Sequence, residues 1–163
     1  MPIKNVSLYA PTKVFFILSL SFLLYNCEKQ IEEINYYSNV DERLHPYFKK
    51  FEQEGKKRGL IIDLEKSNIY GSIERIQNNG IVGLCGNNEK VVIDDNFWAR
   101  SSHYSKELVV FHELGHCYLQ LPHSTHISNN GTCKSIMRPG NGGCLDYYNS
   151  GTRTRLLDEL FSD

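Results

Sequence analysis

The chain has 163 residues, of which 40% are hydrophobic, and its ten Tyr and eight Phe can supply a core. This length suggests one domain, and we expect it to be monomeric. The formal net charge is −1 and no basic stripe stands out, which argues against a nucleic-acid partner.

The N-terminal residues predict an export signal that is not part of the fold. Two lysines precede an apolar run over 14–25, which is too short to span a bilayer comfortably. The run leads into Leu24-Tyr25-Asn26-Cys27, which resembles a bacterial lipobox, where the Cys is lipidated and becomes the mature N-terminus. We therefore predict a lipoprotein signal peptide over 1–26 and lipidation at Cys27. The protein would be exported and membrane-anchored, on an outer-membrane, periplasmic or cell-surface face. A plain N-terminal membrane anchor is the alternative.

The lipidated Cys and a polar tether would occupy 27–40, and the first predicted element is a helix over 41–58. Apolar residues recur there at helical spacing, Asp41 fits an N-cap, and Gly59 fits the C-terminal cap. Short apolar runs bounded by Gly and Asn then predict strands at 60–64, 69–76, 81–84 and 91–93.

The next helix is predicted to begin near 101–105, with a Ser as N-cap, and to run to about residue 120. The Leu-Pro pair that follows ends it, because the residue before a proline disfavours helical conformation. Residues 123–144 are rich in Ser, Asn, Gly and Thr, and a loop of this length is unusual outside a functional site. A helical pattern over 152–161 closes the chain.

Together these elements predict one α+β domain over 41–163. Its small mixed sheet would have about four strands, accompanied by an N-terminal helix, a central helix and a C-terminal helix.

Four cysteines remain beyond Cys27, and an even number in an exported protein predicts two disulfides. Four cysteines allow three pairings. We favour Cys85–Cys117, which would join a strand to the central helix, and Cys133–Cys144, which would close a short Gly-rich loop. Free buried thiols are the alternative.

The central helix carries the sequence His-Glu-Leu-Gly-His at 112–116. Residues four apart on an α-helix are separated by about 40° around the axis and about 6 Å along it, so His112 and His116 project from one face. Two imidazoles on one face can bind one zinc ion. Glu113 between them is placed to take a proton from a zinc-bound water.

A catalytic zinc takes three protein ligands and leaves one position for water. His123 is the natural third ligand, since Pro122 turns the chain just before it. His126 is a competing third ligand.

The run from His112 to His123 resembles the signature of the metzincin clan of zinc peptidases, H-E-x-x-H-x-x-G-x-x-H. Downstream, Ser135-Ile136-Met137-Arg138-Pro139 resembles the Met-turn of that clan, in the form seen in matrix-metalloproteinase-like members. The resemblance implies a zincin fold in which Met137 lies beneath the three imidazoles as a hydrophobic floor and does not bind the metal.

Two departures from the clan's pattern concern the end of the helix. The third His comes one residue late, and Leu119 stands where the family has the Gly that allows a sharp helix exit. Without that Gly the chain must leave the helix in another way. We expect one more helical residue followed by a bend at Pro122. The longer spacing also resembles a group of small predicted metallopeptidase lipoproteins of bacteria, a resemblance carried by residues 93–98, Cys117 and His123.

These observations predict a zinc-dependent endopeptidase with a peptide or protein substrate. The alternative is a membrane-anchored binding lipoprotein whose zinc site is structural or inactive. Two further roles stay open. Asp94 and Asp95 could orient a ligand imidazole or end a strand in a turn. By the metzincin resemblance, Tyr147 or Tyr148 could stabilise an oxyanion, although packing in the core is preferred for both.

Overall fold

The computed structural model describes residues 37–78, 80–125, 132–140 and 142–162, all within a compact unit that spans Asn35–Asp163. The predicted signal peptide and Cys27 lie outside the described residues. Within the described ranges, no helix is both long and apolar enough to cross a membrane. The elements in chain order are η1 (Glu42–Leu44), α2 (His45–Lys57), β1 (Tyr70–Glu74), β2 (Gly83–Gly86), β3 (Lys90–Asp94), α3 (Asp95–Arg100), α4 (His103–Cys117), α5 (Gly142–Leu145) and α6 (Arg153–Leu160).

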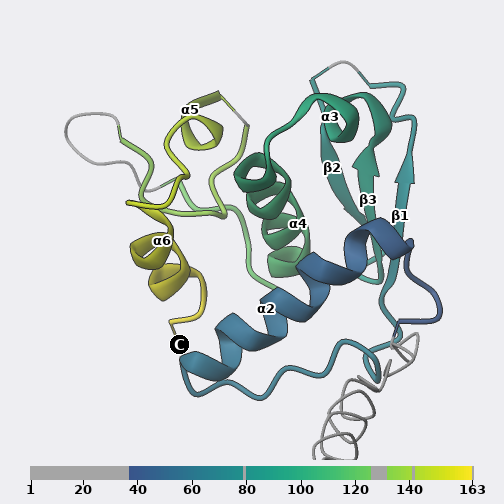
Figure 1. Ribbon diagram of the computed structural model, residues 1–163, viewed down its shortest axis with the longest axis horizontal. Helices are drawn as coiled ribbons and strands as arrows, with labels where there is room; N and C mark the ends of the chain where they lie inside the picture. The colour runs from purple at the N-terminus through teal and green to yellow at the C-terminus, as the bar shows by residue number, and fades with distance from the viewer. Residues whose placement is uncertain (1–36, 79, 126–131, 141, 163) are drawn as a thin grey trace, which may run out of the picture. The chain divides into compact units, whose positions relative to one another are not determined.

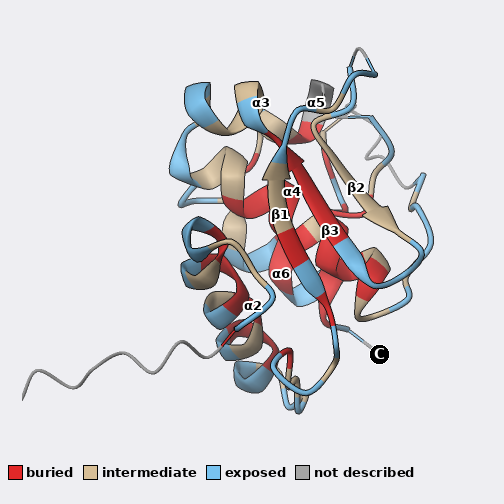
Figure 2. Ribbon diagram, turned by 90° about the vertical axis from the view of Figure 1, so that its right-hand side faces the viewer, coloured by how far each residue is buried: buried red, intermediate tan, exposed pale blue. Residues whose placement is uncertain are grey.

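The sheet has three strands in the described part of the chain, in the order β1-β3-β2. β3 runs parallel to β1 and antiparallel to β2, so the sheet is mixed as predicted. Val91 and Ile93 of β3 are fully buried, and Figure 2 shows this central strand as the buried one of the three. Residues 87–89 link β2 to β3, and Asn87 and Asn88 have φ values of 51° and 59°, which are typical of a tight hairpin turn.

Helix α4 packs against β2 and β3 and also contacts α2 and α5. Figure 1 shows α4 between the sheet and the segment that carries α5 and α6. Aromatic rings join the helices, because Phe51 of α2 lies edge-on to Phe111 of α4 at 5.1 Å between centroids and to Phe161 at 4.9 Å. The predicted α+β class is confirmed, with N-terminal, central and C-terminal helices near the expected ranges.

The predicted strand at 60–64 is wrong, and the described residues form a sheet of three strands where about four were expected. The side chains of this short apolar run differ in burial, since Leu64 is buried while Ile61 is 96% exposed. Its backbone is bonded by side chains, since Leu64 N donates to Glu52 Oε1 at 2.8 Å and Asp63 N donates to Tyr118 Oη at 3.1 Å. The short apolar run therefore belongs to a loop that is held by side-chain hydrogen bonds.

Helix α3 was not predicted from the sequence. Asp94 at the end of β3 is its N-cap and accepts from Phe97 N at 2.9 Å. The other oxygen of this carboxylate accepts from Ile76 N at 3.0 Å. Asp94 thus ends the strand, and of its two open roles the orientation of a ligand imidazole is wrong.

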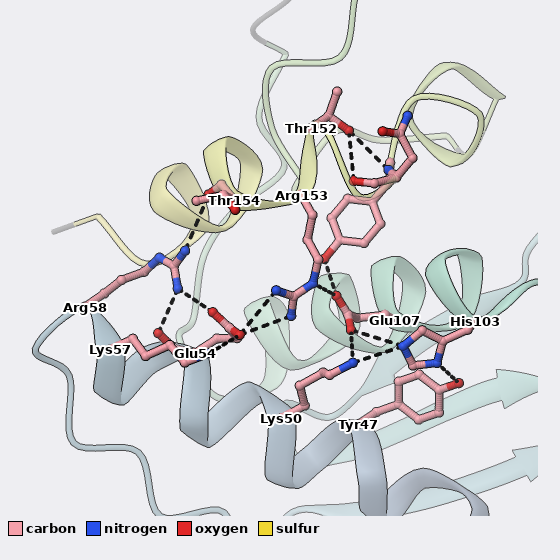
Figure 3. Close-up of polar contacts among 12 residues, drawn as sticks. Tyr47, Lys50, Glu54, Lys57, Arg58, His103, Glu107, Thr152, Arg153 and Thr154 are labelled. Atoms are coloured by element: carbon pink, nitrogen blue, oxygen red, sulfur yellow. Dashed lines mark hydrogen bonds and ion pairs between the residues drawn. The ribbon is translucent and has the colours of Figure 1, made fainter.

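A buried network of charges joins α2, α4 and α6 (Figure 3). Glu107 of α4 is fully buried and accepts from Arg153 of α6, and Lys50 Nζ of α2 lies 2.9 Å from its Oε2. Glu54 of α2 is 4% exposed and accepts from Arg58 at 2.7 Å and from Arg153 at 3.2 Å. The two carboxylates and their cations therefore link three helices that are distant in sequence.

Candidate metal centre

Helix α4 holds the three residues of the predicted motif in fixed positions. Its N-cap Ser102 accepts from Ser105 N at 3.1 Å. The inward side of the helix carries Phe111 and Leu114, both fully buried. His112 and His116 are only partly covered, and the packing of the inward side fixes the direction in which they project.

Both helix histidines use Nδ1 on a backbone carbonyl. His112 Nδ1 lies 2.7 Å from Ile136 O, and His116 Nδ1 lies 2.7 Å from Leu121 O. A carbonyl can only accept, so each Nδ1 must carry the proton. Each neutral ring then presents the lone pair of Nε2, which is the arrangement typical of metal-ligating histidines.

The ligand atoms of His112, His116 and His123 converge. The Nε2 atoms of His112 and His116 are 3.2 Å apart, and the ligand atoms of all three residues lie within 4.8 Å of one another. Two nitrogens bound tetrahedrally to one zinc at about 2.0–2.1 Å would be about 3.3 Å apart. Two facing lone pairs at this separation repel unless a cation lies between them, so the donor set fits a divalent metal. The predicted third residue His123 joins the cluster, and His126 lies outside the described residues.

The exit from α4 differs from the predicted bend at Pro122. The helix ends at Cys117 with Tyr118 as its C-cap, and Gln120 adopts φ 57°, the left-handed conformation that ordinarily favours glycine. Gln120 Nε2 donates to Cys117 O at 2.8 Å, and Leu121 N donates to Gly115 O at 3.0 Å. Gln120 lies three residues before His123. The Gly of the metzincin signature has the same spacing from the third His of that signature. The extra residue is thus accommodated before the left-handed turn.

The segment predicted as a Met-turn lies against the histidines. Ile136 O accepts from His112, and Met137 O accepts from Ser124 N at 2.8 Å, directly after His123. Two consecutive carbonyls of this turn therefore hold the first and third histidines in place. Met137 itself is 3% exposed.

Gly115 makes the close approach of the Met-turn possible. A Cβ on Gly115 would clash with Met137 Sδ, and its other neighbour would be Leu160 of α6 at 3.5 Å. The thioether thus packs directly on the helix backbone at Gly115, which lies between His112 and His116 in the sequence.

Glu113 is 5% exposed and borders the histidines in a groove of about 590 Å³. The groove is lined by residues 80–85 on one side and by the exit of α4 on the other. Burial raises the pKa of Glu113 to about 8. A divalent cation beside this carboxyl would favour its ionised form, the form that a general base requires.

Burial also affects the histidines. It lowers the pKa of His112 to about 4, and it lowers the pKa of His123, with a further contribution from His116. Both shifts favour the neutral imidazole, which is the form that binds metals.

Both predicted disulfides are present. Cys85–Cys117 joins β2 to the residue directly after His116, and Cys133–Cys144 closes the loop around the Met-turn. Tyr148, by contrast, lies away from the groove, because its hydroxyl donates to Glu107 at 2.6 Å in the buried network. Tyr148 packs in the core, which is one of the two roles that the sequence left open for it.

Two residues near the site escaped sequence reasoning. Gly83 in β2 lies against Glu113, and Gln120 makes the left-handed turn. A glycine inside a strand pattern is a signal of close backbone approach, so Gly83 could have been found in the sequence. Gln120 carries no comparable signal, because glutamine is not typical of left-handed positions.

Comparisons of the chain with protein-family models, with curated proteins and with solved structures find no match. The metzincin resemblance therefore rests on the motif residues and stays a prediction.

Proposed function

We propose that this protein is a zinc-dependent endopeptidase with a metzincin-like site. The observation that supports it best is the convergence of three imidazoles beside a buried glutamate in an open groove. His112, His116 and His123 would hold the zinc, leaving one coordination position open toward the groove. The Ser-Ile-Met-x-Pro turn, whose Ile136 carbonyl accepts from His112, supports the same class of enzyme.

Zinc in this site would supply a more acidic water and a Lewis acid for the peptide carbonyl. Glu113 would accept the proton of the attacking water and then pass it to the leaving amine. Its burial keeps competing bulk water away from that proton transfer. The Nδ1 bonds of His112 and His116 hold their rings in the metal-binding tautomer throughout.

The substrate would bind as an extended peptide along residues 81–85. Of the two strands near the site, 91–93 belongs to the central strand β3 and is bonded on both sides, which leaves the edge strand β2. Val82 O accepts from Asp94 N at 2.9 Å, so the alternation of an antiparallel ladder directs the backbone groups of Gly83 and Cys85 away from β3. These free groups border the groove and can pair with a peptide backbone.

The proposal includes export and membrane anchoring through a lipid on Cys27. The two disulfides support an oxidising compartment.

A digest of a peptide library with and without a chelator tests the proposal. We expect internal peptide bonds to be cleaved by the zinc-loaded protein, cleavage to stop with the chelator, and zinc to restore it. Cleavage that continues unchanged after the chelator has removed the metal would contradict a zinc-dependent mechanism.

The alternative is a binding lipoprotein with a closed, structural zinc site. Such a site would need a fourth protein ligand, whereas a catalytic site keeps a water. X-ray absorption of the zinc-loaded protein separates the two: three nitrogens and one oxygen support the peptidase, and a fourth nitrogen or a sulfur supports the structural site.

A further inference from the structure

We propose that Gly83 is a positioning residue that sets the place of the Glu113 carboxylate, so that the missing side chain at residue 83 is a requirement of catalysis. This inference rests on the proposed function, because it assigns to Glu113 the role of general base.

The space at Gly83 is filled by the side chains of α4. A Cβ built on Gly83 would lie 2.7 Å from Glu113 Oε1, 3.0 Å from Glu113 Cγ and 2.8 Å from Val109 Cγ1. All three separations are shorter than ordinary van der Waals contact between heavy atoms, about 3.5–4.0 Å for carbon pairs. Any side chain at residue 83 must therefore displace the carboxylate, Val109, or both.

Backbone conformation does not explain the glycine. Gly59, Gly80 and Gly140 have positive φ values, but Gly83 does not, so another residue could adopt its backbone angles. Glycine inside a strand weakens the strand, because it loses the most conformational freedom on folding and contributes no side chain to packing. The close approach to Glu113 is the feature of this position that calls for glycine.

Strand β2 has little freedom to move away from a new side chain. Gly83 pairs with the fully buried Ile93 of the central strand, and the Cys85–Cys117 disulfide ties β2 to the end of α4. The Glu113 side chain, with its rotatable bonds, is the group that can yield. A methyl group at residue 83 would thus move the carboxylate while leaving the histidines in place.

The same residue faces the substrate side of the groove with its backbone. The N–H and C=O of Gly83 point away from β3, while the Cα hydrogen in the position of a Cβ faces Glu113. Gly83 therefore fixes the distance between a peptide paired with β2 and the group that accepts the proton. A shift of about 1 Å in such a distance can cost on the order of 100-fold in rate.

Gly83→Ala in the full chain tests the inference, with Gly86→Ala as the matched control. Gly86 lies in the same strand, but a Cβ there would have its nearest neighbour at 3.7 Å, and the residue does not line the groove. We expect Gly83→Ala to keep its zinc content, to lose about 10- to 100-fold in kcat and to change KM less than threefold. Gly86→Ala should match the wild type in all three. An unchanged kcat in Gly83→Ala, or an equal loss in both variants, would overturn the inference.

A second variant guards against misfolding. Gly83→Ala combined with Val109→Ala removes the Val109 clash and leaves Glu113 as the close neighbour of the new methyl group. This double variant should fold and bind zinc and still show the loss in kcat. If it regains wild-type kcat, Val109 rather than Glu113 is what Gly83 accommodates, and the inference is wrong.

Thermal melts separate failure of this inference from failure of the proposed function. The contact of residue 83 with Glu113 exists whether or not the protein is a peptidase, so Gly83→Ala should lower Tm more in the wild-type background than in Glu113→Ala. If the wild type hydrolyses nothing, the proposed function fails and the catalytic role of Gly83 fails with it. This holds even where the melts show coupling, which is a larger effect of Gly83→Ala on Tm in the wild type than in Glu113→Ala. If hydrolysis is normal but the melts show no coupling, the positioning inference alone fails.

Discussion

At the scale of single residues, hydrogen bonds and close contacts decide what the histidine motif can do. His112 and His116 each donate Nδ1–H to a carbonyl, and one of these carbonyls belongs to the residue before Met137. The spacing of the two histidines in the sequence indicates a shared face on a helix. It does not indicate the tautomer, because the accepting carbonyls come from a loop and a turn whose paths follow from tertiary packing.

Replacing Gly115 by alanine tests the floor beneath the histidines. Helix propensity alone would make this change stabilising by about 1 kcal/mol. The new methyl group would instead clash with Met137 Sδ, so we expect a net loss of about 1–2 kcal/mol in the free energy of unfolding. Because the displaced turn also carries the carbonyls that hold His112 and Ser124, zinc affinity should fall as well. Urea melts and a chelator competition measure the two effects.

Gly55→Ala is the matched control for Gly115→Ala. Gly55 lies in α2, and a Cβ there would clash with Ile62 Cδ1, far from the histidines in sequence and in a different helix. This variant should lose stability and keep wild-type zinc affinity. Equal zinc affinities in both glycine variants would show that the Met-turn does not support the metal site.

At the scale of elements, the exit of α4 carries the departure from the metzincin signature. Helix type, approximate bounds and the N-cap Ser were predictable, because they follow from local spacing and capping chemistry. The left-handed residue was not predictable, because Gln120 has no intrinsic preference for that conformation. It is held there by its side-chain hydrogen bond to Cys117 O and by the path of the chain to His123.

Substitutions of Gln120 test this account of the exit. Glycine should keep zinc affinity and leave the stability within about 1 kcal/mol, since relief from the left-handed conformation offsets the lost hydrogen bond. Valine, which is β-branched, should be destabilising by about 1–2 kcal/mol and should weaken zinc binding, because Leu121 O next to it holds His116. The check is zinc affinity by chelator competition with both variants, and a valine variant that binds zinc like the wild type would contradict the account.

The strands show the same division between local and tertiary causes. Segments 69–76, 81–84 and 91–93 were predictable as strands, within a few residues, from short apolar runs between Gly and Asn. Segment 60–64 has a similar texture but bonds to Glu52 and Tyr118 side chains, and nothing local distinguishes it from a strand. The partner with which a strand pairs, unlike the presence of a short apolar run, is set by the rest of the chain.

At the scale of the whole molecule, the charge network is the main polar link among the helices. Burial alone would raise the pKa of Glu54, but hydrogen bonds from Lys57 and Arg58 and the charge of Arg153 outweigh it and lower the pKa to about 2. The folded-state pKa lies below the unfolded value of about 4.5. The stabilisation is therefore present above pH 4.5 and is lost as the pH falls from there toward 2.

Glu54→Gln should remove this acid dependence. At pH 7 we expect the variant to be less stable by about 2 kcal/mol, because two partly buried arginine contacts lose their charged partner. Between pH 4.5 and 2 its stability should fall less steeply than that of the wild type, so the two curves converge. Urea melts at several pH values measure this, and parallel curves would show that Glu54 does not titrate as the structure implies.

The central claim is that Glu113 is the general base of a zinc peptidase, and Glu113→Gln tests it most directly. Glutamine has the size of glutamate but cannot accept the proton of the attacking water. The measurement is the rate of peptide hydrolysis by wild type and variant, each with its zinc content determined. We predict equal zinc content and a fall in kcat of about 10³-fold. A variant with the same zinc content that hydrolyses peptides as fast as the wild type would contradict the account.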